Sequence, residues 1–135
     1  MNRVLIALAA LMSLMLVGCS QPPPDDEEVV AQRSQERWDA LVASDFESAY
    51  TYRSPAYREE TSEIEHIVGL SRRRIVWISA DVTAVECEEA RCEVTVSVGY
   101  RADGAPGQIA GMENVRPVRE IWVRLDGQWW YSEIA

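Results

Sequence analysis

Hydrophobic residues recur every three or four positions after residue 24, a spacing that predicts helices. A long helix is expected to begin at Asp25 or Asp26, because acidic residues in a first turn suit the helix dipole. Capping boxes that start at Ser44 and Ser62 predict a second helix, ending at Ser54-Pro55, and a third. The expected buried side of the third helix consists of Ile64, Ile67, Val68 and Leu70.

From residue 75 the hydrophobic period changes to two, which predicts strands. The expected strands are Ile75–Cys87, Cys92–Tyr100, Val118–Leu125 and Gln128–Ile134, the last two joined by the hairpin pair Asp126-Gly127. One side of the first strand is expected to carry Val76, Ile78, Ala80, Val82 and Ala84. Helices in one block and strands in another predict an α+β fold, with three N-terminal helices packed on one face of a four-stranded antiparallel sheet.

The N-terminal segment has the layout of a secretory signal peptide: Arg3 precedes an apolar run over residues 4–17. This run is shorter than the roughly 20 residues that span a bilayer. Its end, from Leu16 to Cys19, resembles a bacterial lipobox. The resemblance implies cleavage before Cys19 and attachment of lipid to its sulfur. The alternative is a secreted protein whose leader happens to end near a cysteine.

The lipobox interpretation divides the chain into a signal peptide (1–18), a lipidated Cys19 with a Pro-rich tether (19–26) and a single domain (27–135). By resemblance to lipoproteins of bacteria with two membranes, Ser20 after the cysteine favours the outer membrane, facing the periplasm. The expected location is therefore the cell envelope.

The net charge and the cysteines exclude some classes of partner and site. The chain has 22 acidic and 13 basic residues and a net charge of −9, so nucleic acid is not an expected partner. Cys87 and Cys92 face each other across a predicted turn, and in an exported protein they are expected to form a disulfide. A redox or metal pair is the alternative, but their spacing is not Cys-x-x-Cys and no second histidine completes a zinc set.

Three segments, Glu36–Tyr50, Ser54–Arg58 and Asp126–Tyr131, resemble the nuclear-transport-factor-2-like (SnoaL-like) superfamily. The resemblance implies that a curved sheet wraps around the helices and leaves a conical apolar cavity. Some members use this cavity as an active site, and others use it for binding or docking. Residues 55–62 do not supply the extra hairpin that several members have between their early helices.

No complete catalytic set is evident, and no metal or cofactor is expected. The residues that could act as acid or base in such a cavity are Asp45, Tyr57, His66, Asp81, Tyr100 and Glu120. Each also has a structural interpretation. Asp45 lies beside a helix cap, Asp81 is expected on an outward strand face, and Glu120 is expected to pair with an arginine on a solvated strand. His66 is expected to be a partly exposed helical histidine.

Aromatic residues on the strands are candidates for ligand binding or docking. They are Trp77, Tyr100, Trp122, Trp129 and Trp130. Because side chains alternate along a strand, Trp129 and Trp130 cannot both enter the core. The run Arg72–Arg74 is expected to close the third helix, with docking of an anionic partner as the alternative.

The favoured interpretation is a lipid-anchored envelope protein with a non-catalytic domain that binds a small apolar ligand or an envelope protein. One alternative is a small cavity enzyme of the isomerase, cyclase or hydratase type that uses an acid–base carboxylate. The other is a structural accessory subunit of an envelope complex, docked through its aromatic sheet face.

We expect mass spectrometry of the natural protein to find Cys19 as the first residue, carrying lipid. The variant Cys19→Ala should leave the membrane fraction without a change in its circular dichroism spectrum, because lipid is the predicted attachment. A bare Cys19, or a variant that stays in the membrane, would count against the anchor.

Overall fold

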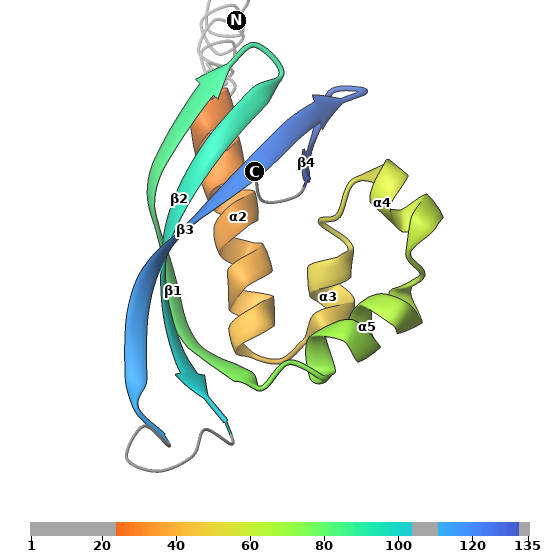
Figure 1. Cartoon of the computed structure of the whole chain (residues 1–135). Helices are drawn as coiled ribbons and strands as arrows, with labels where there is room; N and C mark the ends of the chain where they lie inside the picture. Colours follow the sequence, from red (N-terminus) through yellow and green to blue (C-terminus); the bar gives the residue numbers. More distant parts are fainter. Residues whose placement is uncertain (1–23, 104–110, 133–135) are drawn as a thin grey trace, which may run out of the picture.

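The computed structural model describes residues 24–103 and 111–132 (Figure 1). The helices are α2 (Asp26–Val42), α3 (Phe46–Tyr50), α4 (Pro55–Glu60) and α5 (Glu63–Ser71). The strands are β1 (Ile75–Glu88), β2 (Arg91–Ala102), β3 (Glu113–Leu125) and β4 (Gln128–Tyr131). The predicted leader, Cys19 and most of the tether lie outside the described residues. Within the described ranges, no helix has the length and apolar character needed to cross a membrane.

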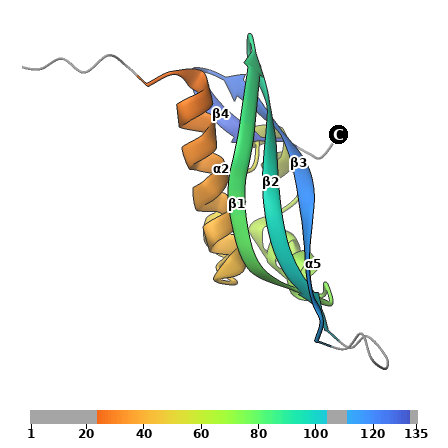
Figure 2. The same ribbon diagram turned by 90° about the vertical axis from the view of Figure 1, so that its left-hand side faces the viewer.

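The strands form one antiparallel sheet in the order β1-β2-β3-β4, which confirms the predicted α+β fold. Figure 1 shows the sheet bending around α2, with α3, α4 and α5 along its open side, and Figure 2 shows α2 running beside β1. The core lies between α2 and the inner face of the sheet. Its fully buried members include Val30, Val94, Val96, Val98 and Trp122.

The inner face of β1 differs from the prediction because the strand is irregular. Its pairing with β2 shifts register twice, between Trp77 and Ser79 and between Val82 and Ala84. Each shift inserts a residue and reverses the alternation of side chains. The side chains that pack on the core are therefore those of Trp77, Ala80, Val82, Val85 and Cys87. The single face predicted from Val76 to Ala84 is wrong.

The first turn of α2 is fastened to the end of the sheet. Asp25 caps the helix by accepting from the backbone N–H of Glu28 at 2.8 Å, which confirms the predicted start. The carboxylate of Asp26 accepts from Arg124 Nη1 at 2.9 Å and from Trp129 Nε1 at 3.0 Å. These bonds tie the beginning of the domain to β3 and β4.

Of the two predicted capping boxes, one is present in the structure and the other is not. The capping box of Ser62 and Glu65 is present at α5. The box predicted at Ser44 is wrong, because Ser44 adopts a positive φ of 58° and Asp45 caps α3 instead, accepting from Ser48 N. The structure also has a helix that was not predicted, α4, which Ser54 caps.

The predicted buried side of α5 is correct only in part: Leu70 packs against the core, but the one residue of the helix that is fully buried is His66. Ile64 is 74% exposed and Val68 is 38% exposed, whereas His66 is 8% exposed. The reason is the direction from which α5 is covered: α3 packs on the side that carries His66, and its Tyr50 ring lies 5.3 Å from the imidazole. Ile64 and Val68, one turn apart, face away from that contact.

The β1–β2 hairpin carries the predicted disulfide. Cys87 and Cys92 are paired in the register of the two strands, with their Cα atoms 4.0 Å apart, and their sulfur atoms are bonded. Strand β3 begins at Glu113, five residues before the predicted start, because β2 pairs with it as far as Arg101. The last residues of the predicted fourth strand, 133–134, lie outside the described residues.

Candidate functional site

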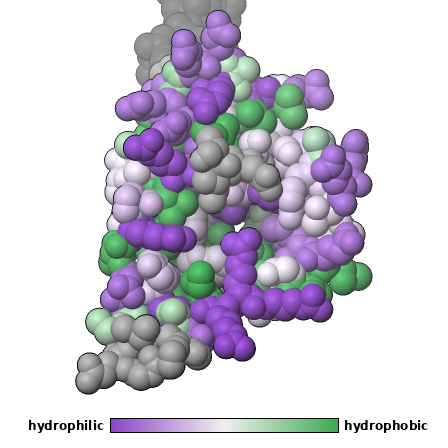
Figure 3. Space-filling model, viewed as in Figure 1, coloured by the Kyte–Doolittle hydropathy of each residue, from purple (hydrophilic) through white to green (hydrophobic). Residues whose placement is uncertain are grey.

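A cavity of about 370 Å³ lies between the helices and the concave side of the sheet. All four strands contribute to its wall, together with α2, α5 and the segments after α3 and α5. Its apolar and aromatic lining residues are Trp38, Leu41, Leu70, Ile75, Trp77, Val98, Tyr100, Val118 and Tyr131. Its charged lining residues are Arg37, Arg53, Arg73, Arg116 and Glu120. Figure 3 shows a hollow on this face with hydrophilic side chains beside it.

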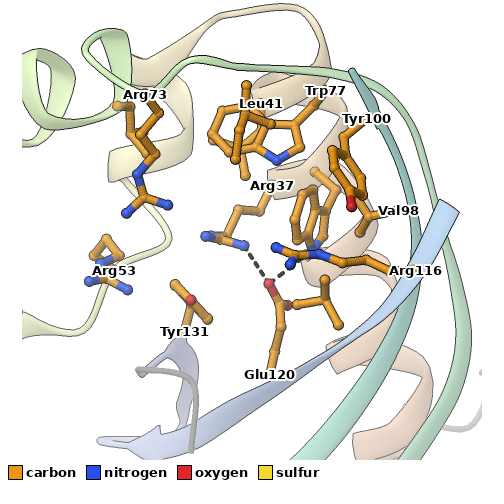
Figure 4. Close-up of a pocket in the computed structure, with 14 residues that line it drawn as sticks. Arg37, Leu41, Arg53, Arg73, Trp77, Val98, Tyr100, Arg116, Glu120 and Tyr131 are labelled. Carbon is orange, nitrogen blue, oxygen red and sulfur yellow. Dashed lines mark hydrogen bonds and ion pairs between the residues drawn. The ribbon is translucent and has the colours of Figure 1, made fainter. Parts of the chain in front are cut away.

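The carboxylate of Glu120 is the centre of a buried hydrogen-bond network (Figure 4). Its Oε1 accepts from Arg37 Nη1 at 2.5 Å and from Trp38 Nε1 at 2.8 Å. Its Oε2 accepts from Ser34 Oγ at 2.9 Å and from Trp122 Nε1 at 3.1 Å. All five residues are at most 8% exposed. Four donors occupy the carboxylate, so Glu120 cross-links α2 to β3 and is poorly suited to act as a general base.

The expectation of a solvated Glu120 is therefore wrong, although the expected arginine partner exists. Glu120 is 0% exposed because it occupies an inward position of β3, opposite Val94 of β2, where α2 covers the sheet. A carboxylate at such a position is stable only when charged and polar donors surround it. Arg37 and its neighbours on α2 supply those donors.

Four arginines converge on the cavity from separate elements. Figure 4 shows the guanidinium groups of Arg37, Arg53 and Arg73 turned toward one another, with Arg116 reaching in from β3. Arg37 is 8% exposed and its guanidinium lies 3.6 Å from the ring centroid of Tyr131. Among the described residues, its Nε has no hydrogen-bond partner.

Backbone pairing places Arg53 in this group. Residue 53 forms a parallel bridge with Tyr131, and its Nη1 donates to the carbonyl of Ser132 at 2.9 Å. Its guanidinium also lies 3.5 Å from the ring centroid of Tyr57. Arg73 and Arg116 are exposed at the edge of the cavity. The cavity therefore has two buried arginines inside and two exposed arginines at its edge.

His66 and Tyr57 form a polar pair behind this arginine group. The hydroxyl of Tyr57 and Nδ1 of His66 are 3.0 Å apart. Nε2 of the imidazole is buried and has no hydrogen-bond partner within the described ranges. The expectation of a partly exposed His66 is wrong, because the rings of Tyr50 and Tyr57 enclose it.

The surroundings of His66 disfavour its charged form. Burial, the largest cause, and the positive charges of Arg53, Arg37 and Arg73 together lower its pKa from 6.5 to about 4. The imidazole is therefore neutral at neutral pH. The shift also records the positive potential that the arginines create on this side of the cavity.

The other acid–base candidates are not brought together. Asp45 is exposed at the N-terminus of α3, where hydrogen bonds from Ser48 lower its pKa. Asp81 is exposed on β1, as expected from the strand pattern. Neither carboxylate lines the cavity, whereas Tyr100 does. In the part of the chain that the structure describes, no three His, Cys, Asp or Glu residues gather as metal ligands.

The five candidate aromatic residues have three different environments. Trp77 and Tyr100 line the cavity. Trp122 and Trp129 are 0% and 3% exposed, and their indole N–H groups bond to Glu120 and Asp26, so the core accounts for both. Trp130 is half-buried, with Arg33 and Arg58 on its ring at 5.8 and 4.8 Å. As predicted, Trp129 and Trp130 do not both enter the core.

Sequence reasoning missed most of the charged lining. Arg37, Arg53 and Arg116 were not among the candidate residues. One signal was present: Arg116, Val118 and Glu120 alternate along one strand and so share the face that ends at Trp122. Recognising that face as buried required the position of α2.

No protein-family model matches the sequence, and no curated protein matches it. Solved structures do match its fold. One is a SEC-C motif containing protein from Rhodopseudomonas palustris, with a TM-score of 0.57 and 18% identity over 75% of this chain and 73% of that protein. A second is a candidate dehydratase of the NTF2-like family from Streptomyces avermitilis, with a TM-score of 0.54 and 14% identity over 82% and 96% of the two chains.

A third is an NTF2-like protein from Cytophaga hutchinsonii, with a TM-score of 0.52 and 16% identity over 83% of this chain and 99% of that one. At such identities the likeness concerns the fold alone. The chain has the cone fold of NTF2-like proteins, as the sequence resemblance implied.

We expect Glu120→Gln to lower the free energy of unfolding by about 3 kcal/mol, because a neutral amide leaves the buried Arg37 guanidinium without its counter-charge. Urea denaturation followed by tryptophan fluorescence measures the change. The matched control is Glu93→Gln, whose 3.7 Å ion pair with Arg119 is exposed and should cost less than about 1 kcal/mol. Equal losses in the two variants would refute the central role of Glu120.

The lowered pKa of His66 predicts a pH dependence of stability. The unfolded chain binds a proton at this residue below about 6.5, and the folded chain binds it only near pH 4. The contribution of His66 to the unfolding free energy is therefore fully present above this window and is lost as the pH falls through it. We expect the stability difference between the natural protein and His66→Asn to decrease from pH 7.5 to pH 4.5. A constant difference would contradict the assignment.

Proposed function

We propose that the protein is a lipid-anchored envelope protein whose cavity binds a small molecule without changing it chemically. The observation that carries the proposal is a cavity of about 370 Å³ whose one lining carboxylate, among the described residues, is occupied by four donors. The volume falls at the lower end of the range of about 300–1,000 Å³ that is typical of small-molecule sites.

The composition of the wall supports binding of a mainly apolar body. Trp77, Leu41 and Val98 present indole and aliphatic surface, and Tyr100 adds a ring with a polar end. Sites of this kind combine apolar walls with a few fixed polar groups that orient the ligand. The anchor at Cys19 would hold this domain at the surface of the envelope membrane.

Two other functions receive less support. A cavity enzyme of the isomerase, cyclase or hydratase type needs a carboxylate that can exchange protons, and Glu120 is engaged while Asp45 and Asp81 lie elsewhere. An accessory subunit docked through aromatic residues needs them exposed, and Trp122 and Trp129 are in the core. Of the two adjacent tryptophans on β4, Trp130 lies outside the core, and its ring is covered by the side chains of Arg33 and Arg58.

We expect the neutral fluorescent probe N-phenyl-1-naphthylamine to bind the natural protein and to bind Val118→Trp at least about tenfold more weakly, because an indole at position 118 fills the cavity. Fluorescence titration measures both affinities. The matched control is Val115→Trp, on the same strand and 73% exposed, which should bind like the natural protein. Equal binding by both variants would place the probe outside the cavity and refute the proposal.

A further inference from the structure

The proposed ligand-binding function can be made more specific, and the inference rests on that function. We propose that the ligand is a carboxylic acid with an apolar body. Its carboxylate lies among Arg37, Arg73 and Arg116, and its apolar part lies against Leu41 and Trp77. The inference depends on four observations: the charge balance of the cavity, the state of Arg37, the position of the edge arginines and the shape of the wall.

The charge balance of the cavity is opposite to that of the whole protein. The chain has a net charge of −9, yet four of its 13 basic residues line the cavity and a single acidic residue does so within the described ranges. Glu120 already neutralises Arg37 through their contact. Arg73 and Arg116 add two further guanidinium charges at the edge of this partly apolar space, an arrangement that attracts an anion.

The buried Nε of Arg37 is the strongest single indication that the ligand carries a hydrogen-bond acceptor. Its side chain is 9% exposed, one terminal nitrogen bonds to Glu120, and its Nε finds no acceptor among the described residues. A buried N–H without a partner destabilises the protein, because the group has lost its hydrogen bonds to water. A carboxylate oxygen in the cavity would accept from it, so bound acid would relieve this cost while a neutral hydrocarbon would not.

Arg73 and Arg116 are placed to contact a carboxylate from two sides. They come from opposite sides, one from the segment after α5 and the other from β3, and both are exposed at the cavity edge. In the part of the chain that the structure describes, neither forms an ion pair with a carboxylate of the protein; Arg116 instead lies 5.2 Å from the ring centroid of Tyr100. The planar fork of an arginine matches a carboxylate, with two parallel hydrogen bonds.

The opposite wall is apolar, which specifies the rest of the ligand. Figure 4 shows Leu41 and Trp77 together on one side, away from Glu120, and Val98 beside Tyr100. Trp77 is held there by edge-to-face contacts with Trp38 and Phe46, both at 6.3 Å between ring centroids. A short aromatic or aliphatic body fits this wall, and a small inorganic anion would leave it empty.

The experiment compares two ligands of nearly equal size and the same apolar body, the anionic 3-phenylpropionate and the neutral 3-phenylpropionamide. Isothermal titration calorimetry on the full protein at pH 7.5 should give at least about tenfold tighter binding of the acid, since hydrogen bonds to charged groups are about twice as strong as neutral ones. In the double variant Arg73→Gln/Arg116→Gln this preference should fall to less than about threefold. Arg119→Gln, on the outer face of β3, is the control and should keep it.

His66 supplies an independent readout, because it is the only histidine of the chain and senses Arg37, Arg53 and Arg73. Bound carboxylate offsets the field of these arginines, so the pKa of His66 should rise from about 4 when the acid is added and stay unchanged with the amide. Proton NMR of the imidazole over a pH titration measures this shift.

The outcomes separate the inference from the function on which it rests. Equal affinity for acid and amide, or an unchanged preference in the double variant, overturns the inference and leaves the binding function in place. The same holds if N-phenyl-1-naphthylamine binds in the cavity and the acid does not. If none of the three compounds binds, both proposals are refuted.

Discussion

The ion pair between Glu120 and Arg37 determines how the first helix sits on the sheet. A carboxylate with no solvent exposure is tolerated because four donors satisfy it, and three of those donors belong to a single stretch of α2, Ser34 to Trp38. The fourth, from Trp122, comes from the same strand as Glu120. The network fixes the position of α2 relative to β3, and with it the side of the cavity where Arg37 meets the other arginines.

The cavity follows from the curvature of the sheet. Two register shifts in β1 allow a long strand to bend while Trp77 and Ala80 both reach the inner face. The helices then close the open side, and the segment after α3 is held to β4 by the pairing of Arg53 with Tyr131. Elements distant in sequence thus place their charged side chains around one space. Burial, together with the positive charges there, lowers the pKa of His66 and keeps the imidazole neutral.

Local patterns in the sequence predicted the elements, and contacts between elements decided the rest. The start of α2, the α5 capping box, the clean alternation of β2 and the disulfide hairpin all depend on residues within a few positions of one another, and these were predicted. The buried side of α5 and the inner face of β1 depend on what covers them, so Ile64 and Val76 were misassigned. The burial of Glu120 was missed for the same reason: three of its four donors are more than 80 residues away in the chain.

The attachment of α2 to the end of the sheet has a consequence for biosynthesis. Asp26 bonds to Trp129 across 103 residues and Ser34 bonds to Glu120 across 86, so the partners of the first helix are made long after the helix itself. Loops of this length close slowly, and the core contacts form only after they close. A chain that leaves the ribosome N-terminus first would remain unfolded until β3 and β4 emerge. The export proposed for this protein would benefit from this delay, because a narrow translocation channel accepts only an unfolded chain.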